Sequence, residues 1–344
     1  GGEFTQRAFL SGRMDLIQAE SVADLIDAES AGAARNAVGQ LQGRMSRSVG
    51  GIYDALMDVV SRFYAIVDYP DEEIEPLQQA QIEQTLAESA ERLDALLATF
   101  SRGRLLKSGV PAVILGKPNA GKSSLLNALL GYDRAIVTDI AGTTRDTVEE
   151  KVLVGSVLLR LCDTAGIRDA ADTVERLGVE RAQQAAQRAE LALLVLDGSA
   201  PLTREDEEAI AAARRARRML VLVNKADLPQ VLDTAALRVR FGEVIPLSAR
   251  SGAGVDALCR AVEELFAGGE TPRGELLTNA RQAESAQRAL DAVRRAEQAL
   301  RSGLSPDAVL TDAEEALEAL AEFSGKRVRD DLVATIFSRF CVGK

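Results

Sequence analysis

Residues 113–130 read VILGKPNAGKSSLLNALL. Three apolar residues typical of a buried strand lead into a glycine-rich loop of the pattern GxxxxGKS, and a helical run follows. Glycines let a backbone wrap around phosphates, and the N–H groups at a helix start attract negative charge. We expect Lys122 to reach the β- and γ-phosphates and the Ser123 hydroxyl to bind magnesium. The stretch predicts a nucleoside-triphosphate site in a strand–loop–helix unit.

Four further elements follow in the order found in GTPases: GTTRD at 142–146, DTAG at 163–166, NKAD at 224–227 and SAR at 248–250. The last three each end an apolar run. The Asp227 carboxylate can accept hydrogen bonds from the N1–H and the exocyclic amine of guanine, which adenine does not offer together. Each short element alone could be an ordinary polar turn. All five in this order predict GTP as the ligand.

The residues expected to contact GTP belong to these elements or lie in the segment just before the second one. They are Asn119, Ala120, Gly121, Lys122, Ser123, Ser124, Thr138, Asp139, Ile140, Ala141, Gly142, Thr143, Thr144, Asp163, Thr164, Ala165, Gly166, Asn224, Lys225, Asp227, Ser248, Ala249 and Arg250. A carboxylate at 163 can hold magnesium-bound water, and a backbone N–H of SAR can hold the base. A threonine of the GTTRD segment can bind magnesium, and this segment would then act as a mobile switch that responds to the nucleotide.

Short apolar runs and helical stretches alternate through the middle of the chain. The runs lie at 113–115, 157–161, 191–196, 219–223 and 244–247. Fully apolar strands separated by helices indicate a mostly parallel sheet that is covered on both faces. On either side the apolar residues recur at helical spacing instead. We read three helices within 14–107, a stripe from Ala286 to Leu300, a helix that starts at Ser305-Pro306, and a last stripe of Leu332, Ile336 and Phe340.

The predicted fold is an α/β P-loop GTPase (Ras-like) domain inserted into a discontinuous all-α helical-bundle domain. Its expected parts are 1–107 and 269–344 for the helical domain and 108–268 for the G domain. Amphipathic helices on both sides of the G domain need partners to bury their stripes, which favours one helical domain. Two separate helical appendages are the alternative.

Composition narrows the chemistry. The 344 residues include no histidine, so imidazole cannot act as a base or a metal ligand, and the three cysteines lack metal-ligand spacing. We expect a cytoplasmic protein without a membrane span, because no apolar run approaches ~18 residues. The formal charge of −11 argues against a general polyanion-binding surface, although a local basic patch could still meet RNA. The first residue is Gly, so we expect that the natural N-terminus is missing.

Hydrolysis cannot follow the usual route. Ras-like GTPases place a glutamine directly after the DxxG element to orient water, and Ile167 stands there in this chain. Asn119, beside the 138–143 segment, could hold a monovalent cation where the charge of an arginine finger would sit, but its residue type equally suits a turn. Glu175 alone reads as an exposed acid near a helix start.

The chain resembles the MnmE (TrmE) family of tRNA-modification GTPases, which belong to the TrmE-Era-EngA-like P-loop GTPases. The resemblance covers essentially the whole sequence. It rests on the P-loop stretch and on the segments EFTQRAFL (3–10), DLIDA (24–28), DYPDEEI (68–74), TDIAGTTRD (138–146) and CVGK (341–344). These are far more specific than the GTPase motifs alone.

The resemblance implies a dimeric, potassium-stimulated GTPase that acts with the flavoprotein MnmG (GidA), which alone holds FAD. The pair places a carboxymethylaminomethyl- or aminomethyl-type group on C5 of the wobble uridine of tRNA, using a folate one-carbon unit. By position, the potassium ligands are Asn119, Thr138, Ile140 and Thr143. Magnesium is held by Ser123 and Thr144. The catalytic residues are Glu175, which helps to orient the hydrolytic water, and Lys122.

The family also points to a folate site, at Arg13 and Lys344, and to a terminal cysteine, Cys341. Whether Cys341 attacks uridine or only completes a site stays open, because a neutral thiol needs a nearby positive charge to act as a nucleophile. Both basic residues could equally be solvated surface charges. The family's folate-binding and dimerising domain precedes the start of this chain, so most of it is expected to be missing. GTP binding should survive its loss, while constitutive dimerisation and folate binding by this chain alone stay open.

Two other classes of function compete with a GTPase subunit for wobble-uridine modification. A ribosome-assembly or other RNP-regulating GTPase would carry an appended RNA-binding module, and residues 270–344 show only amphipathic helices. A mechanochemical membrane GTPase would carry a lipid-binding insertion or a basic amphipathic helix, and the sequence shows neither.

Overall fold

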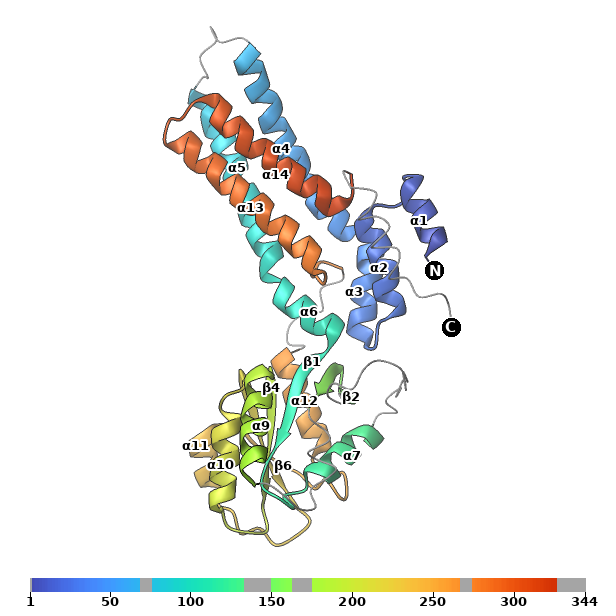
Figure 1. The fold of residues 1–344 in the computed structure, drawn as a ribbon, viewed down its shortest axis with the longest axis vertical. Coiled ribbons are helices and arrows are strands. Elements are labelled where there is room, and N and C mark those ends of the chain that lie inside the picture. Colours follow the sequence, from blue (N-terminus) through green and yellow to red (C-terminus); the bar gives the residue numbers. More distant parts are fainter. Residues whose placement is uncertain (1, 69–75, 133–149, 163–174, 267–273, 327–344) are drawn as a thin grey trace. The chain divides into compact units, whose positions relative to one another are not determined.

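The computed structural model describes residues 2–68, 76–132, 150–162, 175–266 and 274–326, with side chains except at 65–68, 76–78, 132 and 175–181. The chain forms two compact units. One combines Gly1–Lys107 with Pro272–Lys344, and the other is Ser108–Thr271. Figure 1 shows the first as a helical unit and the second as a sheet with helices around it. The predicted fold class, a P-loop domain inserted into a discontinuous helical domain, is confirmed.

Helices from both ends of the sequence build the helical unit. They are α1 (Glu3–Leu10), α2 (Leu16–Ile26), α3 (Ala31–Leu41), α4 (Arg44–Asp68), α5 (Pro76–Ala98), α6 (Phe100–Ser108), α13 (Ala280–Arg301) and α14 (Pro306–Ser324). α13 packs against α5 and α14, and α14 packs against α4 (Figure 1). Their apolar stripes meet in one core around Phe63, Leu290 and Phe323, which are fully buried. Each segment therefore buries its stripe against the other.

A buried ion pair joins the two segments as well. The Glu20 carboxylate of α2 accepts hydrogen bonds from the Arg281 guanidinium at 3.0 Å and from the Gln282 amide at 2.7 Å. Arg281 also donates to the backbone carbonyls of Glu322 and Phe323 at the end of α14. A buried carboxylate needs such partners to offset its lost hydration, so this cluster fixes how α2, α13 and α14 meet.

The described strands of the second unit form one sheet. They are β1 (Val110–Leu115), β2 (Glu150–Val154), β3 (Val157–Leu161), β4 (Leu191–Asp197), β5 (Arg218–Asn224) and β6 (Val244–Pro246). The order is β2-β3-β1-β4-β5-β6, and the β2–β3 pair is antiparallel while the other pairs are parallel. Every residue of β4 is buried, as expected for a parallel sheet with both faces covered.

Helices α7 (Lys122–Tyr132), α9 (Glu175–Arg188), α10 (Arg204–Ala213), α11 (Thr234–Phe241) and α12 (Val255–Phe266) surround this sheet (Figure 1). The strand register places the carboxyl ends of β4 and β5 level with each other, with Asp197 opposite Asn224. β1 runs parallel to β4 and leads directly into the glycine-rich loop. Loops at the carboxyl ends of parallel strands are where α/β sheets usually bind ligands.

The structure corrects the expected element count at several places. The described residues between 14 and 108 form five helices and not three, and α1 lies before them. The missed α3 reads AGAARNAVGQL, in which alanine and glycine replace the large apolar residues that reveal a helical stripe. β2 (EKVLV) was missed although it ends in three apolar residues, because only Gly155 and Ser156 separate it from the run at 157–161. The expected stripe of Leu332, Ile336 and Phe340 lies outside the described residues.

Candidate nucleotide-binding site

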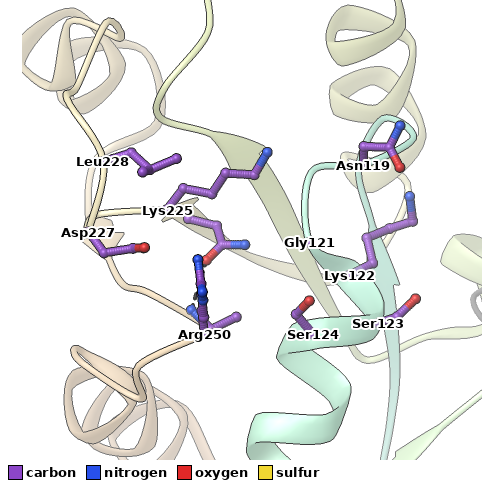
Figure 2. Close-up of a pocket in the computed structure, with 11 residues that line it drawn as sticks. Asn119, Gly121, Lys122, Ser123, Ser124, Lys225, Asp227, Leu228 and Arg250 are labelled. Carbon is purple, nitrogen blue, oxygen red and sulfur yellow. Dashed lines mark hydrogen bonds between the residues drawn. The ribbon is translucent and has the colours of Figure 1, made fainter.

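A pocket of about 550 Å³ opens at the carboxyl ends of β1 and β5, a volume typical of small-ligand sites. Figure 2 shows two groups of residues facing each other across it. The glycine-rich loop and α7 contribute one side, and the loops after β5 and β6 contribute the other. The lining residues are Asn119, Gly121, Lys122, Ser123, Ser124, Asn224, Lys225, Asp227, Leu228, Ala249 and Arg250.

Backbone crowding explains the two glycines of the GxxxxGKS pattern. A Cβ on Gly116 would lie 2.3 Å from the carbonyl oxygen of Val195, and one on Gly121 would lie 2.0 Å from the Asn224 side-chain nitrogen. Neither position has room for any side chain. Asn119 adopts a left-handed backbone with φ 62°, which Asn tolerates better than most residues. The loop sequence therefore matches the curvature that a phosphate cradle needs.

Lys122 is the first residue of α7, and its side chain reaches back across the glycine-rich loop. Its ammonium donates to the carbonyls of Gly116 at 2.9 Å and Lys117 at 2.8 Å. Burial lowers the pKa of Lys122 from its usual value. A partly desolvated ammonium among first-turn N–H groups is a strong site for an anion, because both contribute positive potential.

Asn224 connects the two sides of the pocket. Its buried side-chain amide donates to the Ala120 carbonyl at 2.8 Å, while its oxygen accepts from the Ala249 N–H at 2.9 Å. The Ser248 N–H donates to the Ala253 carbonyl. The N–H groups of Ser248 and Ala249 thus already have partners. Among the described residues the Arg250 N–H has none, so it is the backbone donor of SAR that could bind a ligand.

The side chains on the base side are also positioned by hydrogen bonds. Ser248 donates its hydroxyl to the Asp227 carboxylate at 2.6 Å, and this hydrogen bond lowers the pKa of Asp227. Lys225, at φ 63°, bonds the Asp197 carboxylate at 2.6 Å. Burial alone would raise the pKa of Asp197, but hydrogen bonds from Lys225 and Ser199 together lower it. Both carboxylates are therefore ionised at neutral pH.

Sequence patterns missed several residues that shape the site. Leu228 lines the pocket just after the NKAD motif. Asp197, at the end of β4, holds Lys225. Lys117 of the loop forms an ion pair of 2.8 Å with the fully buried Asp206 of α10. The strand-end position of Asp197 was a usable signal. Asp206 lies 89 residues from Lys117 and belongs to no motif.

The structure brings together the predicted residues of the P-loop, NKAD and SAR elements. Ala120 and Ser248 lie just behind the pocket wall, and the other predicted residues of these elements line it. The predicted residues outside the described part of the chain are Thr138, Asp139, Ile140, Ala141, Gly142, Thr143, Thr144, Asp163, Thr164, Ala165, Gly166, Cys341 and Lys344. α9 begins at Glu175, whose side chain is not among those described, and Arg13 is exposed in the helical unit.

The donor set present suits a magnesium ion held largely by the nucleotide. In the described part of the chain, no cluster of three or more Asp, Glu, Cys or His side chains could hold a metal. Mg²⁺ in phosphate sites uses only one or two protein ligands besides water and phosphate oxygens. The Ser123 hydroxyl, in the pocket wall at the first turn of α7, fits that role.

The fold and this pocket define a P-loop protein of the GTPase class. A family model described as the MnmE helical domain matches residues 16–341. The tRNA modification GTPase MnmE of Roseiflexus sp. (strain RS-1) is 44% identical, covering 100% of this chain and 76% of that protein. MnmE of Lacticaseibacillus paracasei is 43% identical, with 100% and 75% covered. The chain belongs to the MnmE family of tRNA modification GTPases.

Solved structures are similar at a much lower level. The G domain of the T. maritima FeoB iron transporter has 22% identity and a TM-score of 0.35, and the match covers 45% of this chain and 97% of that one. A TM-score this low does not bear on function.

We predict that Gly121→Ala weakens GTP binding by at least about tenfold. The new methyl group would collide with the Asn224 amide, and Ala is strained at φ 100°; overpacking and strain each cost about 1–3 kcal/mol. The matched control is Gly131→Ala on α7, where a Cβ has nothing within 4 Å. Titration with a fluorescent GTP analogue measures both variants. Equal affinities for Gly121→Ala and the control would contradict the packing argument.

Proposed function

We propose that this GTPase is stimulated by potassium and acts with the flavoprotein MnmG (GidA) on C5 of the tRNA wobble uridine. The modification would be a carboxymethylaminomethyl- or aminomethyl-type group built with a folate one-carbon unit. The observation that carries the GTPase part is the Asn224 amide, which fastens the phosphate loop to the loop after β6. Family membership supports tRNA as the substrate.

Guanine recognition is assigned to the base side of the pocket. The ionised Asp227 carboxylate accepts hydrogen bonds from the N1–H and exocyclic amine of guanine, and Ser248 holds it in place. The Arg250 N–H is the donor proposed for the guanine O6. The aliphatic part of Lys225, whose ammonium is paired with Asp197, and the Leu228 side chain would lie beside the base. Adenine does not offer both donors, so the Asp227 carboxylate would lose hydrogen-bond partners if adenine occupied the base position.

The phosphates are assigned to the other side. Lys122 and the N–H groups that begin α7 would hold the β- and γ-phosphates. Ser123, with Thr144 and water held by Asp163, would bind Mg²⁺, which neutralises charge on the phosphate oxygens when bound. Lys122 already faces the carbonyls of the loop, so nucleotide binding needs only local adjustment of this ammonium.

Hydrolysis is assigned to residues other than glutamine. Asn119 lies in the pocket wall, and its left-handed backbone is compatible with a carboxamide presented to the phosphate side. We assign it as a potassium ligand, together with Thr138, Ile140 and Thr143, by family position. Glu175 would orient the attacking water, since Ile167 cannot. The remaining GTP contacts assigned by position are in the 138–144 and 163–166 segments.

Partner and location follow from the family. MnmG would supply FAD, two copies of this chain would pair across their nucleotide faces, and Arg13 with Lys344 would contact folate. Cys341 belongs to the same proposed site. A cytoplasmic location suits a tRNA substrate. None of the described helices is both long and apolar enough to span a bilayer.

We predict that Asp227→Asn shifts base preference from guanine to xanthine. Asn presents an N–H where guanine also donates, whereas xanthine offers a carbonyl there. GTP affinity should fall by about 100-fold, since a hydrogen bond to a charged group contributes about 1.5–3 kcal/mol. Competition binding with GTP and xanthosine triphosphate measures the shift, with the exposed Asp256→Asn as a control of equal charge. A uniform loss for both nucleotides would argue against direct base contact.

We predict that replacing potassium by sodium at constant ionic strength slows GTP turnover by roughly tenfold or more, because a preorganised positive charge at the transition state is lost. Asn119→Gly should reduce the difference between the two salts. Glycine keeps the φ 62° backbone without strain and removes only the carboxamide. Steady-state phosphate release provides the rates. Equal turnover in both salts would remove the role of Asn119.

We predict that cells lacking this gene lose the C5 modification of the wobble uridine. Mass spectrometry of digested tRNA measures it. The wild-type gene should restore the modified nucleoside, and Glu175→Ala should restore it poorly because GTP hydrolysis is slowed while nucleotide still binds. Full modification in the deleted strain would refute the proposed function.

A further inference from the structure

Five exposed arginines gather at one end of the G-domain sheet. Arg188 ends α9, and the other four belong to the RRARR turn (214–218), which follows α10 and ends at Arg218, the first residue of β5. The two segments lie side by side, because the N–H groups of Arg217 and Arg218 donate to the carbonyls of Ala189 and Glu190. We call this group, Arg188, Arg214, Arg215, Arg217 and Arg218, the arginine surface.

The arginine surface lies at the opposite end of the sheet from the nucleotide pocket. In the β4–β5 ladder, Arg218 pairs with Leu191 at the amino ends, while Asp197 pairs with Asn224 at the carboxyl ends beside the pocket. α9 and α10 pack against each other, α9 on β1 and α10 on β4 (Figure 1). Changes at the surface therefore leave the residues that contact the nucleotide untouched.

The charges of this surface are largely unneutralised. Arg188 and Arg215 have neither a hydrogen bond nor an ion pair from their side chains among the described residues. Arg217 is 3.6 Å from Glu190 and stays 74% exposed. Arg218 lies over the Phe266 ring at 4.8 Å and donates to the Leu265 carbonyl. A ring positions a guanidinium without removing its charge.

An aromatic residue extends the surface toward α11. The Phe241 ring has Arg214 at 5.7 Å and Arg240 at 4.9 Å from its centroid. Arg240 is paired with Glu207, so it is neutralised, whereas Arg214 has no such partner at bonding distance among the described residues. Guanidinium groups held by aromatic rings form a preorganised layer with N–H groups free for oxyanions.

We propose that the arginine surface binds the phosphate backbone of the tRNA substrate. This inference rests on the chain acting on tRNA. The protein carries a formal charge of −11, so contact with RNA needs a local group of positive charges, and five neighbouring arginines supply one. Planar guanidinium groups bind phosphates through paired hydrogen bonds, and phosphate contacts position a nucleic acid without reading its bases.

The test compares two variants of the full chain that each remove two positive charges. Arg188→Gln/Arg215→Gln changes the two arginines without partners. Arg35→Gln/Arg204→Gln, the control, changes exposed arginines elsewhere. Binding of an unmodified tRNA transcript is followed by fluorescence anisotropy over a series of salt concentrations. GTP hydrolysis is measured in parallel.

The Arg188→Gln/Arg215→Gln variant should bind tRNA roughly tenfold more weakly at low salt, with a slope of log K against log salt shallower by about two. The control should match wild type, and GTP hydrolysis should be unchanged in both. Equal tRNA affinity and slope in both variants would overturn the inference. So would loss of self-association in sedimentation with unaltered tRNA binding, which would identify an acidic protein surface as the occupant. GTP hydrolysis is measured separately, so unchanged tRNA binding with normal hydrolysis would reject only this inference and leave the GTPase proposal standing.

Discussion

The side-chain amide of Asn224 is the constraint on which the nucleotide pocket depends. It donates to the Ala120 carbonyl at 2.8 Å and accepts from the Ala249 N–H at 2.9 Å, while almost completely buried. Only a group with a donor and an acceptor on one planar end can make both bonds. Leaving either partner unmet in a dry site costs about 1–3 kcal/mol. The spacing between the phosphate side and the base side is thus set by one amide, and Gly121 is required because the amide lies where its Cβ would be.

Ion pairs between neighbouring elements hold the rest of this frame. Lys117 ties the phosphate loop to Asp206 in the first turn of α10, where Thr203 donates to the same carboxylate. Lys225 is tied to Asp197 at the end of β4. Each pair connects a loop to a strand end or helix start that the sheet already fixes. The phosphate loop and the loop after β5 are preorganised in this way, so binding does not have to order these two loops.

The order of the motifs and the spacing of apolar residues were enough to predict most of the fold and the position of the pocket. GxxxxGKS, NKAD and SAR each follow an apolar run, and strands β1, β5 and β6 bring them to one edge, as a parallel sheet must. The Lys117–Asp206 pair was beyond reach, because nothing local marks two charges that meet only after α10 packs on the sheet. α3 was missed since its alanine-rich face gives no periodic signal. The Arg250 N–H became the candidate donor only when Ala249 was found bonded to Asn224.

The net charge of the chain is a poor guide to whether part of its surface can bind RNA. Charges on a protein surface are screened beyond about 8–10 Å at physiological salt, so a phosphate group senses its near neighbours and not the sum over 344 residues. The four arginines of the RRARR turn lie within five consecutive residues, and Arg188 lies on the segment bonded to them. Within one screening length, such a group outweighs acidic residues spread over both units. An overall charge of −11 and a local anion-binding surface are therefore compatible. The sheet separates that surface from the nucleotide pocket by the length of its strands.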